Sequence, residues 1–281
     1  MSWHGQINRT IWEIRHLIEQ RPKDLRLRRE LLRTHFLQRF EYDRSHHIPR
    51  DDRSFLFLQD GRTPACLLLH GANGTPAEMR DLGNYLYSKG FTVFCPRASR
   101  FDAKDRPVTW ESWVTLARDA LETTLDYSKK TMLVGLSIGG TVAMTLNQVQ
   151  PVPAMALLAP AVAPKLGFKG QLYSIVRHIS PTLFYRYAGW NGEIAKAMDH
   201  VRNDIKDITT PTLVLQALDD RVMSTKGLKI LRRRVTHEDS EVVVLPSGTH
   251  ALTRGKAKND VFERVFQFAV KQNLITLDES T

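Results

Sequence analysis

The sequence predicts an α/β protein built around a mostly parallel, doubly wound sheet. From about residue 55 onward, short β-like runs alternate with helical patterns, the order that places parallel strands beside crossover helices. Two of these runs, residues 67–69 and 242–244, are continuously apolar, as expected for strands buried on both faces. The chain has 281 residues, of which 42% are hydrophobic, so it can bury one large α/β core or two small ones.

Residues 1–45 predict a pair of helices ahead of the sheet. Apolar residues recur there at three- and four-residue steps, and Pro22 opens the second apolar-periodic run. A polar stretch follows over residues 41–53 and is the best candidate for a linker. We therefore divide the chain into a helical amino-terminal extension, residues 1–50, and a main domain, residues 51–281.

The main domain contains the alternating elements. Strands are predicted at residues 54–58, 65–69, 92–95, 131–134, 155–158, 212–216 and 241–245. Helices are predicted at residues 76–88, 110–127, 139–148, 225–234 and 256–271. The alternation breaks at about residues 160–207, an aromatic-rich insertion. In a sheet of this type, chemistry gathers at the carboxyl ends of the strands, so functional residues are expected there.

Composition excludes several classes of protein. The net charge of +10 is dispersed, and its densest clusters, residues 26–29 and 232–234, lie on predicted amphipathic helices. We interpret them as solvated helix faces and expect no nucleic-acid partner.

The longest apolar run, residues 152–164, holds three prolines and is too short for a membrane span of about 20 residues. We read no signal peptide in the charged first turns, and the two cysteines predict reduced thiols in a cytoplasmic protein.

A serine, an aspartate and a histidine follow three of the predicted strands. The serine lies in Gly135-Leu-Ser137-Ile-Gly139, between a β-like run and a helix, and Asp220 and His250 follow two later strands. Gly-x-Ser-x-Gly in that context is the pattern of a nucleophile elbow. The serine adopts a strained backbone conformation, and larger side chains at the two glycine positions would collide where strand and helix pass closely.

These segments resemble the α/β-hydrolase family, and most closely its small bacterial carboxylesterases and monoacylglycerol lipases. The resemblance covers roughly residues 55–274 and rests on Leu67-Leu-Leu-His-Gly-Ala-Asn-Gly-Thr, Gly135-Leu-Ser-Ile-Gly-Gly, Asp220-Arg-Val-Met and Gly248-Thr-His250. It implies that Ser137 is the nucleophile, that His250 is the base and that Asp220 orients the imidazole. It also implies an oxyanion hole formed by the backbone N–H groups of Ala72 and Ile138.

The same resemblance implies that the insertion at residues 160–207 is a cap over the site. Its aromatic residues, among them Phe168, Phe184 and Trp190, then line an apolar acyl pocket, or else they pack on one another as a satellite core. The reaction needs no cofactor and no metal. We interpret His46-His47 as solvated loop because no carboxylate or thiol lies at ligand spacing.

Single residues have competing interpretations. Asp219 adjoins Asp220, which fits the family spacing better, and His237 rivals His250 but precedes the last strand. Two departures from the family pattern concern Thr249, directly before the histidine, and a loop after residue 96 that lacks the usual glycines. The first leaves the path of His250 less defined, and the second concerns the pocket wall.

Two functions of different classes follow. The first is a serine hydrolase that cleaves small-molecule carboxylic esters, with short- to medium-chain acyl groups or monoacylglycerols, through an acyl-enzyme. The same triad also serves hydrolysis of carbon–carbon, amide or lactone bonds. The second is a non-catalytic binding module whose amino-terminal helices dock a partner or an anionic membrane surface. The helical segment is also compatible with a hairpin packed on the main domain or with a homodimer contact.

Overall fold

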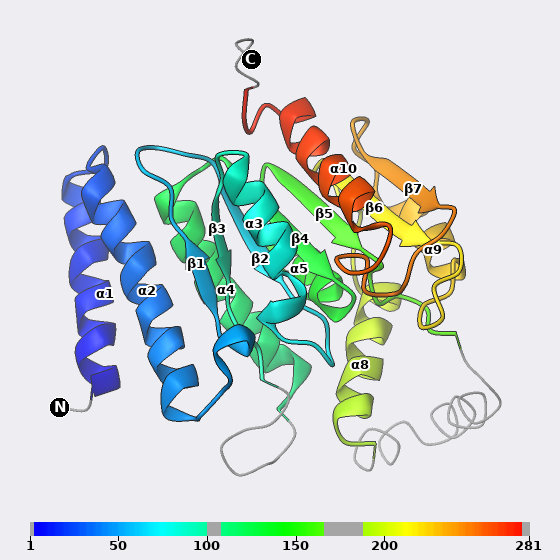
Figure 1. Cartoon of the computed structure of the whole chain (residues 1–281), viewed down its shortest axis with the longest axis horizontal. Coiled ribbons are helices and arrows are strands. Elements are labelled where there is room, and N and C mark those ends of the chain that lie inside the picture. Colours follow the sequence, from blue (N-terminus) through cyan, green and yellow to red (C-terminus); the bar gives the residue numbers. More distant parts are fainter. Residues whose placement is uncertain (1–2, 100–107, 166–187, 277–281) are drawn as a thin grey trace.

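The computed structural model describes residues 3–99, 108–165 and 188–276, which form one seven-stranded sheet with helices on both faces (Figure 1). The strands are β1 (Phe55–Phe57), β2 (Ala65–Leu69), β3 (Thr92–Cys95), β4 (Thr131–Leu136), β5 (Ala154–Leu158), β6 (Thr212–Ala217) and β7 (Glu241–Leu245). Their order across the sheet is β1-β3-β2-β4-β5-β6-β7. Among them β1 is antiparallel to β3 and the other neighbours are parallel, so the predicted mostly parallel sheet is confirmed.

The helices alternate with these strands. They are α1 (Trp3–Gln20), α2 (Leu25–Ser45), α3 (Arg80–Ser88), α4 (Trp110–Tyr127), α5 (Ile138–Val149), α8 (Trp190–Asn203), α9 (Lys226–Arg234) and α10 (Lys258–Lys271). Short 3₁₀ turns span Arg50–Asp52 and Pro76–Glu78. The single helix predicted over residues 76–88 is therefore a 3₁₀ turn followed by α3.

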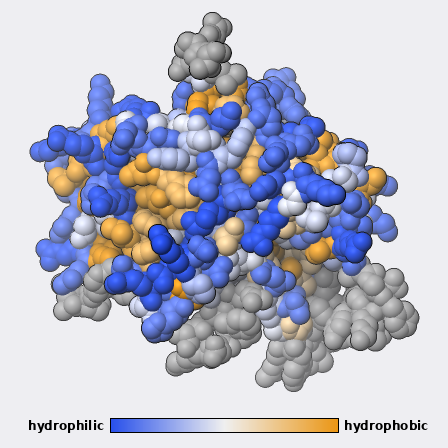
Figure 2. All heavy atoms as spheres, viewed as in Figure 1, coloured by the Kyte–Doolittle hydropathy of each residue, from blue (hydrophilic) through white to orange (hydrophobic). Residues whose placement is uncertain are grey.

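Two apolar layers enclose the sheet. Alternate residues of β2 point to opposite faces, so Leu67 packs with the layer of α4, α5 and α8, while Leu68 packs with α3 and α10. Cys66 and Cys95 are buried and free, and burial raises the pKa of both thiols, as predicted for reduced cysteines. Hydrophilic residues cover much of the molecular face shown in Figure 2.

The prediction that both apolar runs are buried on both faces is wrong for β7. This strand ends the sheet, and its central valines are only half-buried, with Val244 38% exposed. The run in β2, by contrast, is buried throughout because strands flank it on both sides. An apolar run indicates a strand, but its place in the sheet decides how much of it is covered.

The amino-terminal helices form a hairpin that packs on the edge of the sheet. Ile14 and Ile18 of α1 pack against Leu31 of α2 in a small core. The next residue, Leu32, belongs to the main apolar layer that includes α4 and Phe94 of β3. In Figure 1 the hairpin stands beside β1.

The densest basic clusters differ from the expectation of solvated faces. Arg28 donates hydrogen bonds to the carbonyls of Pro22 and Asp126, and Arg29 donates to the carbonyl of Gln59. Arg28 and Arg29 therefore attach α2 to the main domain, so the interpretation is wrong for these two side chains. The cluster on α9 is largely exposed, as predicted.

The predicted linker at residues 41–53 is not a flexible joint. Helix α2 continues to Ser45, and Asp43 within it is 2% exposed. The Asp43 carboxylate accepts hydrogen bonds from the Ser54 N–H and Oγ–H at 2.8 and 2.9 Å, and it pairs with Arg97 Nε at 2.7 Å. The polar composition predicted a solvated linker, but the side chains of Asp43, Ser54 and Arg97 form hydrogen bonds with one another instead of with water.

We expect Asp43→Asn to lower the free energy of unfolding by about 3 kcal/mol, because it leaves the buried Arg97 guanidinium without its counter-charge. Urea unfolding followed by circular dichroism measures this change. The control is Glu41→Gln, which removes an exposed ion pair with Arg44 and should cost below about 1 kcal/mol. Equal effects of the two substitutions would contradict the role given to Asp43.

Candidate active site

Ser137 lies on a sharp turn between β4 and α5. Its backbone has φ 56° and ψ −118°, a conformation that side-chain-bearing residues rarely adopt. A Cβ atom at Gly135 would collide with the backbone of Gly139, and one at Gly139 would collide with the backbone of Leu69. The Gly-x-Ser-x-Gly spacing is thus required by the close approach of α5 to β4 and β2, as predicted from the sequence.

The structure brings the three predicted side chains into contact at the carboxyl end of the sheet. His250 Nε2 lies 2.9 Å from Ser137 Oγ, and His250 Nδ1 lies 2.9 Å from Asp220 Oδ2. Because a carboxylate can only accept, Nδ1 carries the proton, which leaves the lone pair of Nε2 directed at the hydroxyl. The arrangement suits removal of a proton from Ser137.

Asp220 is fully buried, yet it remains a good acceptor. Burial raises its pKa, but the hydrogen bonds from His250 and from the backbone N–H groups of Met223 and Val222 outweigh burial and hold the pKa below its usual value. The two backbone bonds to Oδ1 are 2.9 and 2.7 Å long. The carboxylate is therefore ionised and fixed beside the imidazole.

Asp219 and His237, the alternatives to Asp220 and His250, do not take part in the contact with Ser137. Asp219 Oδ1 accepts the Gly248 N–H at 2.8 Å, which ties the loop carrying His250 to the end of β6. His237 precedes β7 and lies at the amino end of that strand, while His250 follows it. Despite the additional Thr249, this loop places His250 within hydrogen-bond distance of Ser137.

Ala72 and Ile138 both lie beside the serine turn. Neither backbone N–H donates a hydrogen bond within the described ranges, and Ile138 is the first residue of α5. The preceding Gly71 is close to Ser137, since a Cβ atom there would lie 3.5 Å from Ser137 Cβ. Two unengaged N–H groups next to a hydroxyl are what a developing oxyanion requires, and their role stays a prediction.

His70 holds the turn that carries Ala72. Its Nε2 accepts the Ala98 N–H at 3.0 Å, so its proton is on Nδ1, which donates to the Gly71 carbonyl at 2.9 Å. Burial lowers the pKa of His70 to about 4. Because both ring nitrogens are engaged, His70 positions the turn and is not available as a base.

Glu78 is a further residue of this turn that the sequence analysis missed. Its carboxylate accepts the Gly71 N–H. Burial raises the pKa of Glu78, while that hydrogen bond and the charges of Arg254 and His250 act in the opposite direction. The available signal was Thr75-Pro-Ala-Glu78, the spacing of a capping box, in which the glutamate ordinarily bonds back to the cap residue.

The predicted cap is described only in part. Phe168 and Phe184 lie outside the described residues. Trp190 begins α8 and is 7% exposed, with its ring 5.1 Å from that of Trp113, whose ring in turn lies 5.3 Å from that of His70. Trp190 thus packs in the apolar layer, and a role in substrate binding stays a prediction.

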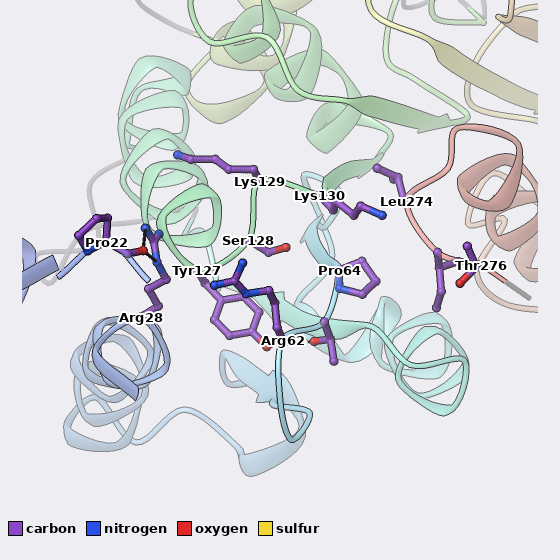
Figure 3. Close-up of a pocket in the computed structure, with 12 residues that line it drawn as sticks. Pro22, Arg28, Arg62, Pro64, Tyr127, Ser128, Lys129, Lys130, Leu274 and Thr276 are labelled. Atoms are coloured by element: carbon purple, nitrogen blue, oxygen red, sulfur yellow. Dashed lines mark hydrogen bonds between the residues drawn. The ribbon is translucent and has the colours of Figure 1, made fainter. Parts of the chain in front are cut away.

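A surface cavity of about 480 Å³ lies far from these residues (Figure 3). Pro64 and Lys130 line it, and each directly precedes the amino end of a strand, β2 or β4. Ser137 follows the opposite, carboxyl end of β4. This cavity therefore takes no part in the chemistry of the serine.

Comparisons with known proteins show what the chain is similar to. Residues 185–256 match the family described as "Serine aminopeptidase, S33", a range that includes Asp220 and His250. The chain is 25% identical over 244 residues to a carboxylesterase of Bacillus subtilis (strain 168), which covers 76% of this chain and 96% of that protein. It is 24% identical over 235 residues to a thermostable monoacylglycerol lipase of Bacillus sp. (strain H-257). That match covers 76% of this chain and 94% of the lipase. Among solved structures it resembles one described under "LipS and LipT, two metagenome-derived lipolytic enzymes", with a TM-score of 0.65, 16% identity, and coverage of 79% of this chain and 98% of that one.

The two adjacent aspartates provide a matched test. We expect Asp220→Asn to slow the reaction of Ser137 with a fluorophosphonate probe by roughly 10³- to 10⁴-fold, because the amide no longer fixes the productive imidazole tautomer. Asp219→Asn keeps an acceptor for the Gly248 N–H and should change the rate little. Labelling rates measured by mass spectrometry compare the variants, and an equal loss in both would contradict the assignment.

Glu78 is tested through the same labelling reaction. We expect Glu78→Ala to lower the rate at saturating probe by roughly tenfold to a hundredfold, since the turn carrying Ala72 loses its support. The probe concentration at half-maximal rate should hardly change. Glu78→Gln keeps an acceptor oxygen and should retain most of the rate, so an unchanged alanine variant would show that Glu78 does not position the turn.

Proposed function

We propose that this chain, an α/β-hydrolase related to carboxylesterases and monoacylglycerol lipases, is a serine hydrolase that cleaves carboxylic esters through an acyl-enzyme. The observation that carries the proposal is the continuous contact from Asp220 through His250 to Ser137, with both hydrogen bonds 2.9 Å long. The named activities of the two Bacillus relatives supply the reaction class.

In the first half of the reaction, Ser137 Oγ attacks the ester carbonyl carbon while His250 Nε2 takes the hydroxyl proton. The negative charge that develops on the carbonyl oxygen is held by the N–H groups of Ala72 and Ile138. Asp220 stabilises the imidazolium that forms. Collapse of the tetrahedral intermediate breaks the carbon–oxygen bond, and His250 passes its proton to the leaving alcohol.

In the second half, a water molecule attacks the acyl group on Ser137. His250 takes a proton from this water, and the same two N–H groups hold the second oxyanion. Breakdown of that intermediate returns the proton to Ser137 Oγ and releases the carboxylic acid. The cycle uses groups of the chain and water, so a cofactor or metal has no step in it.

The substrates we propose are esters with short- to medium-chain acyl groups, or monoacylglycerols. The relatives support this class by name. The triad chemistry itself is shared with hydrolysis of amide, lactone and carbon–carbon bonds, so the substrate class requires a direct measurement.

We also propose a cytoplasmic location and a peripheral contact surface on the hairpin. The two free, buried cysteines support a reducing compartment. As a separate observation, none of the described helices has the length and hydropathy of a membrane span. Trp12 and Leu17 of α1 are 67% and 37% exposed, which supports a contact with a second copy or with a membrane surface.

A panel of esters tests the proposed function. We expect the wild type to hydrolyse p-nitrophenyl acetate, butyrate and octanoate, and Ser137→Ala to lose about 10⁴-fold or more of kcat, because no other hydroxyl replaces the nucleophile. The control is Ser112→Ala on the exposed side of α4, which should retain activity. Turnover that survives in Ser137→Ala would contradict the mechanism, and faster cleavage of matched anilides would contradict the ester assignment.

A further inference from the structure

A cavity of about 520 Å³ lies between α1, α2 and α4, where the hairpin meets the main domain. Its walls include Arg15, His35, Gln38, Arg39 and Asp119. Three buried nitrogen atoms at this cavity, Arg15 Nε, His35 Nε2 and Arg39 Nε, have no hydrogen-bond partner among the described residues. Buried polar groups are usually satisfied, so three such atoms around one cavity point to a ligand.

The hydrogen bonds of Thr123 bear on the protonation of His35. Thr123 Oγ1 lies 2.9 Å from the Asp119 carbonyl oxygen and 2.9 Å from His35 Nδ1, and its single proton can serve only one of these acceptors. We assign this proton to the Asp119 carbonyl, so that His35 Nδ1 is the donor to Thr123 Oγ1. Burial, together with the charges of Arg39 and Arg15, lowers the pKa of His35 to about 3, so the ring is neutral and Nε2 has a free lone pair. The side chain is 4% exposed.

The two arginines are only loosely paired. Within the described ranges Arg39 makes no hydrogen bond, and its ion pair with Asp119 is 3.7 Å long. Arg15 donates one long hydrogen bond of 3.4 Å to Thr123, and its ion pairs run from Nη2 to Glu122 at 3.8 Å and from Nε to Asp126 at 3.5 Å. Among the described residues, neither guanidinium group has a short, well-formed partner, so both can donate to an anion that enters the cavity.

We propose that this cavity binds a small oxyanion that also carries a hydroxyl proton, namely singly protonated phosphate or a phosphate monoester. The guanidinium groups of Arg15 and Arg39 donate to the anionic oxygens, and the ligand hydroxyl donates to His35 Nε2. Both kinds of unpartnered atom are satisfied at once. A ligand with oxygens but no proton leaves the imidazole lone pair unsatisfied, which is costly in a buried site.

The cavity in Figure 3 carries no such argument. It is also basic, with Arg28, Arg62, Lys129 and Lys130 in its walls. Among the described residues, none of the atoms lining it is a buried nitrogen or oxygen without a hydrogen-bond partner. The side chains of Arg15 and Arg39 are also partly exposed, 38% and 28%, so the buried unpartnered atoms, and not the exposure of the cations, distinguish the cavity at the hairpin.

Isothermal titration of the full chain near pH 6 tests the site with inorganic phosphate, glycerol 3-phosphate and sulfate. Sulfate has the shape of phosphate but no proton at this pH. We expect one phosphate per chain with a Kd of about 1 mM or tighter, and sulfate at least about tenfold weaker. Comparison of free phosphate with glycerol 3-phosphate identifies the preferred source of the anion. No saturable binding of either, or equal binding of sulfate and phosphate, would overturn the proposal.

Variants locate the binding. We expect Arg39→Gln to weaken phosphate binding at least about tenfold, and Arg39→Lys, which keeps the charge, to weaken it less. His35→Phe should remove the preference for phosphate over sulfate. Arg9→Gln is the control, since Arg9 is exposed and pairs with Glu13 on α1. Circular dichroism and labelling of Ser137 report folding independently of the anion, and a folded Arg39→Gln variant with undiminished binding would overturn the assignment.

Discussion

The close approach at the Ser137 turn is the constraint on which the site depends. A backbone with φ near 56° costs about 1–3 kcal/mol for a residue with a side chain, so the surroundings must hold it. Here the Ser137 N–H donates to the Leu158 carbonyl at 2.9 Å, and the Ala161 N–H donates to the Ser137 carbonyl at 3.0 Å. Leu158 is the last residue of β5, and Ala161 lies in the segment that follows it. The parallel sheet therefore supplies the support that keeps the hydroxyl facing His250.

A second turn faces the first and is held by side chains instead of strands. The backbone of Gly71 is bonded on both sides, its carbonyl by His70 and its N–H by Glu78. Both side chains are buried enough to have shifted pKa values, His70 downward and Glu78 upward. Fixing a turn with buried polar groups costs desolvation but limits its movement, which suits a site whose donors must be in place before charge develops.

Much of this architecture could be predicted from the sequence because it rests on local patterns. The elbow glycines and the alternation of strands and helices follow from spacing along the chain, and the choice of Asp220 over Asp219 follows from the resemblance to the α/β-hydrolase family. The failures concern contacts between distant residues. Asp43 looked like part of a solvated stretch because Ser54 and Arg97, which satisfy it, lie 11 and 54 residues away. The sequence analysis did not single out Glu78, and its capping-box spacing with Thr75 predicts a bond to the cap residue, whereas its partner in the structure is Gly71. The exposure of β7 could not be inferred, because the amino-acid sequence does not show which strand lies at the edge of the sheet.

The contacts of Asp43 have a consequence for the turn beside Ser137. Arg97, which Asp43 pairs with, directly precedes Ala98, whose N–H bonds to His70 beside the serine. Two hydrogen bonds and the peptide link between Arg97 and Ala98 thus connect the end of α2 to the turn that carries His70. Removal of the hairpin would therefore take away the carboxylate that holds Arg97 next to this turn.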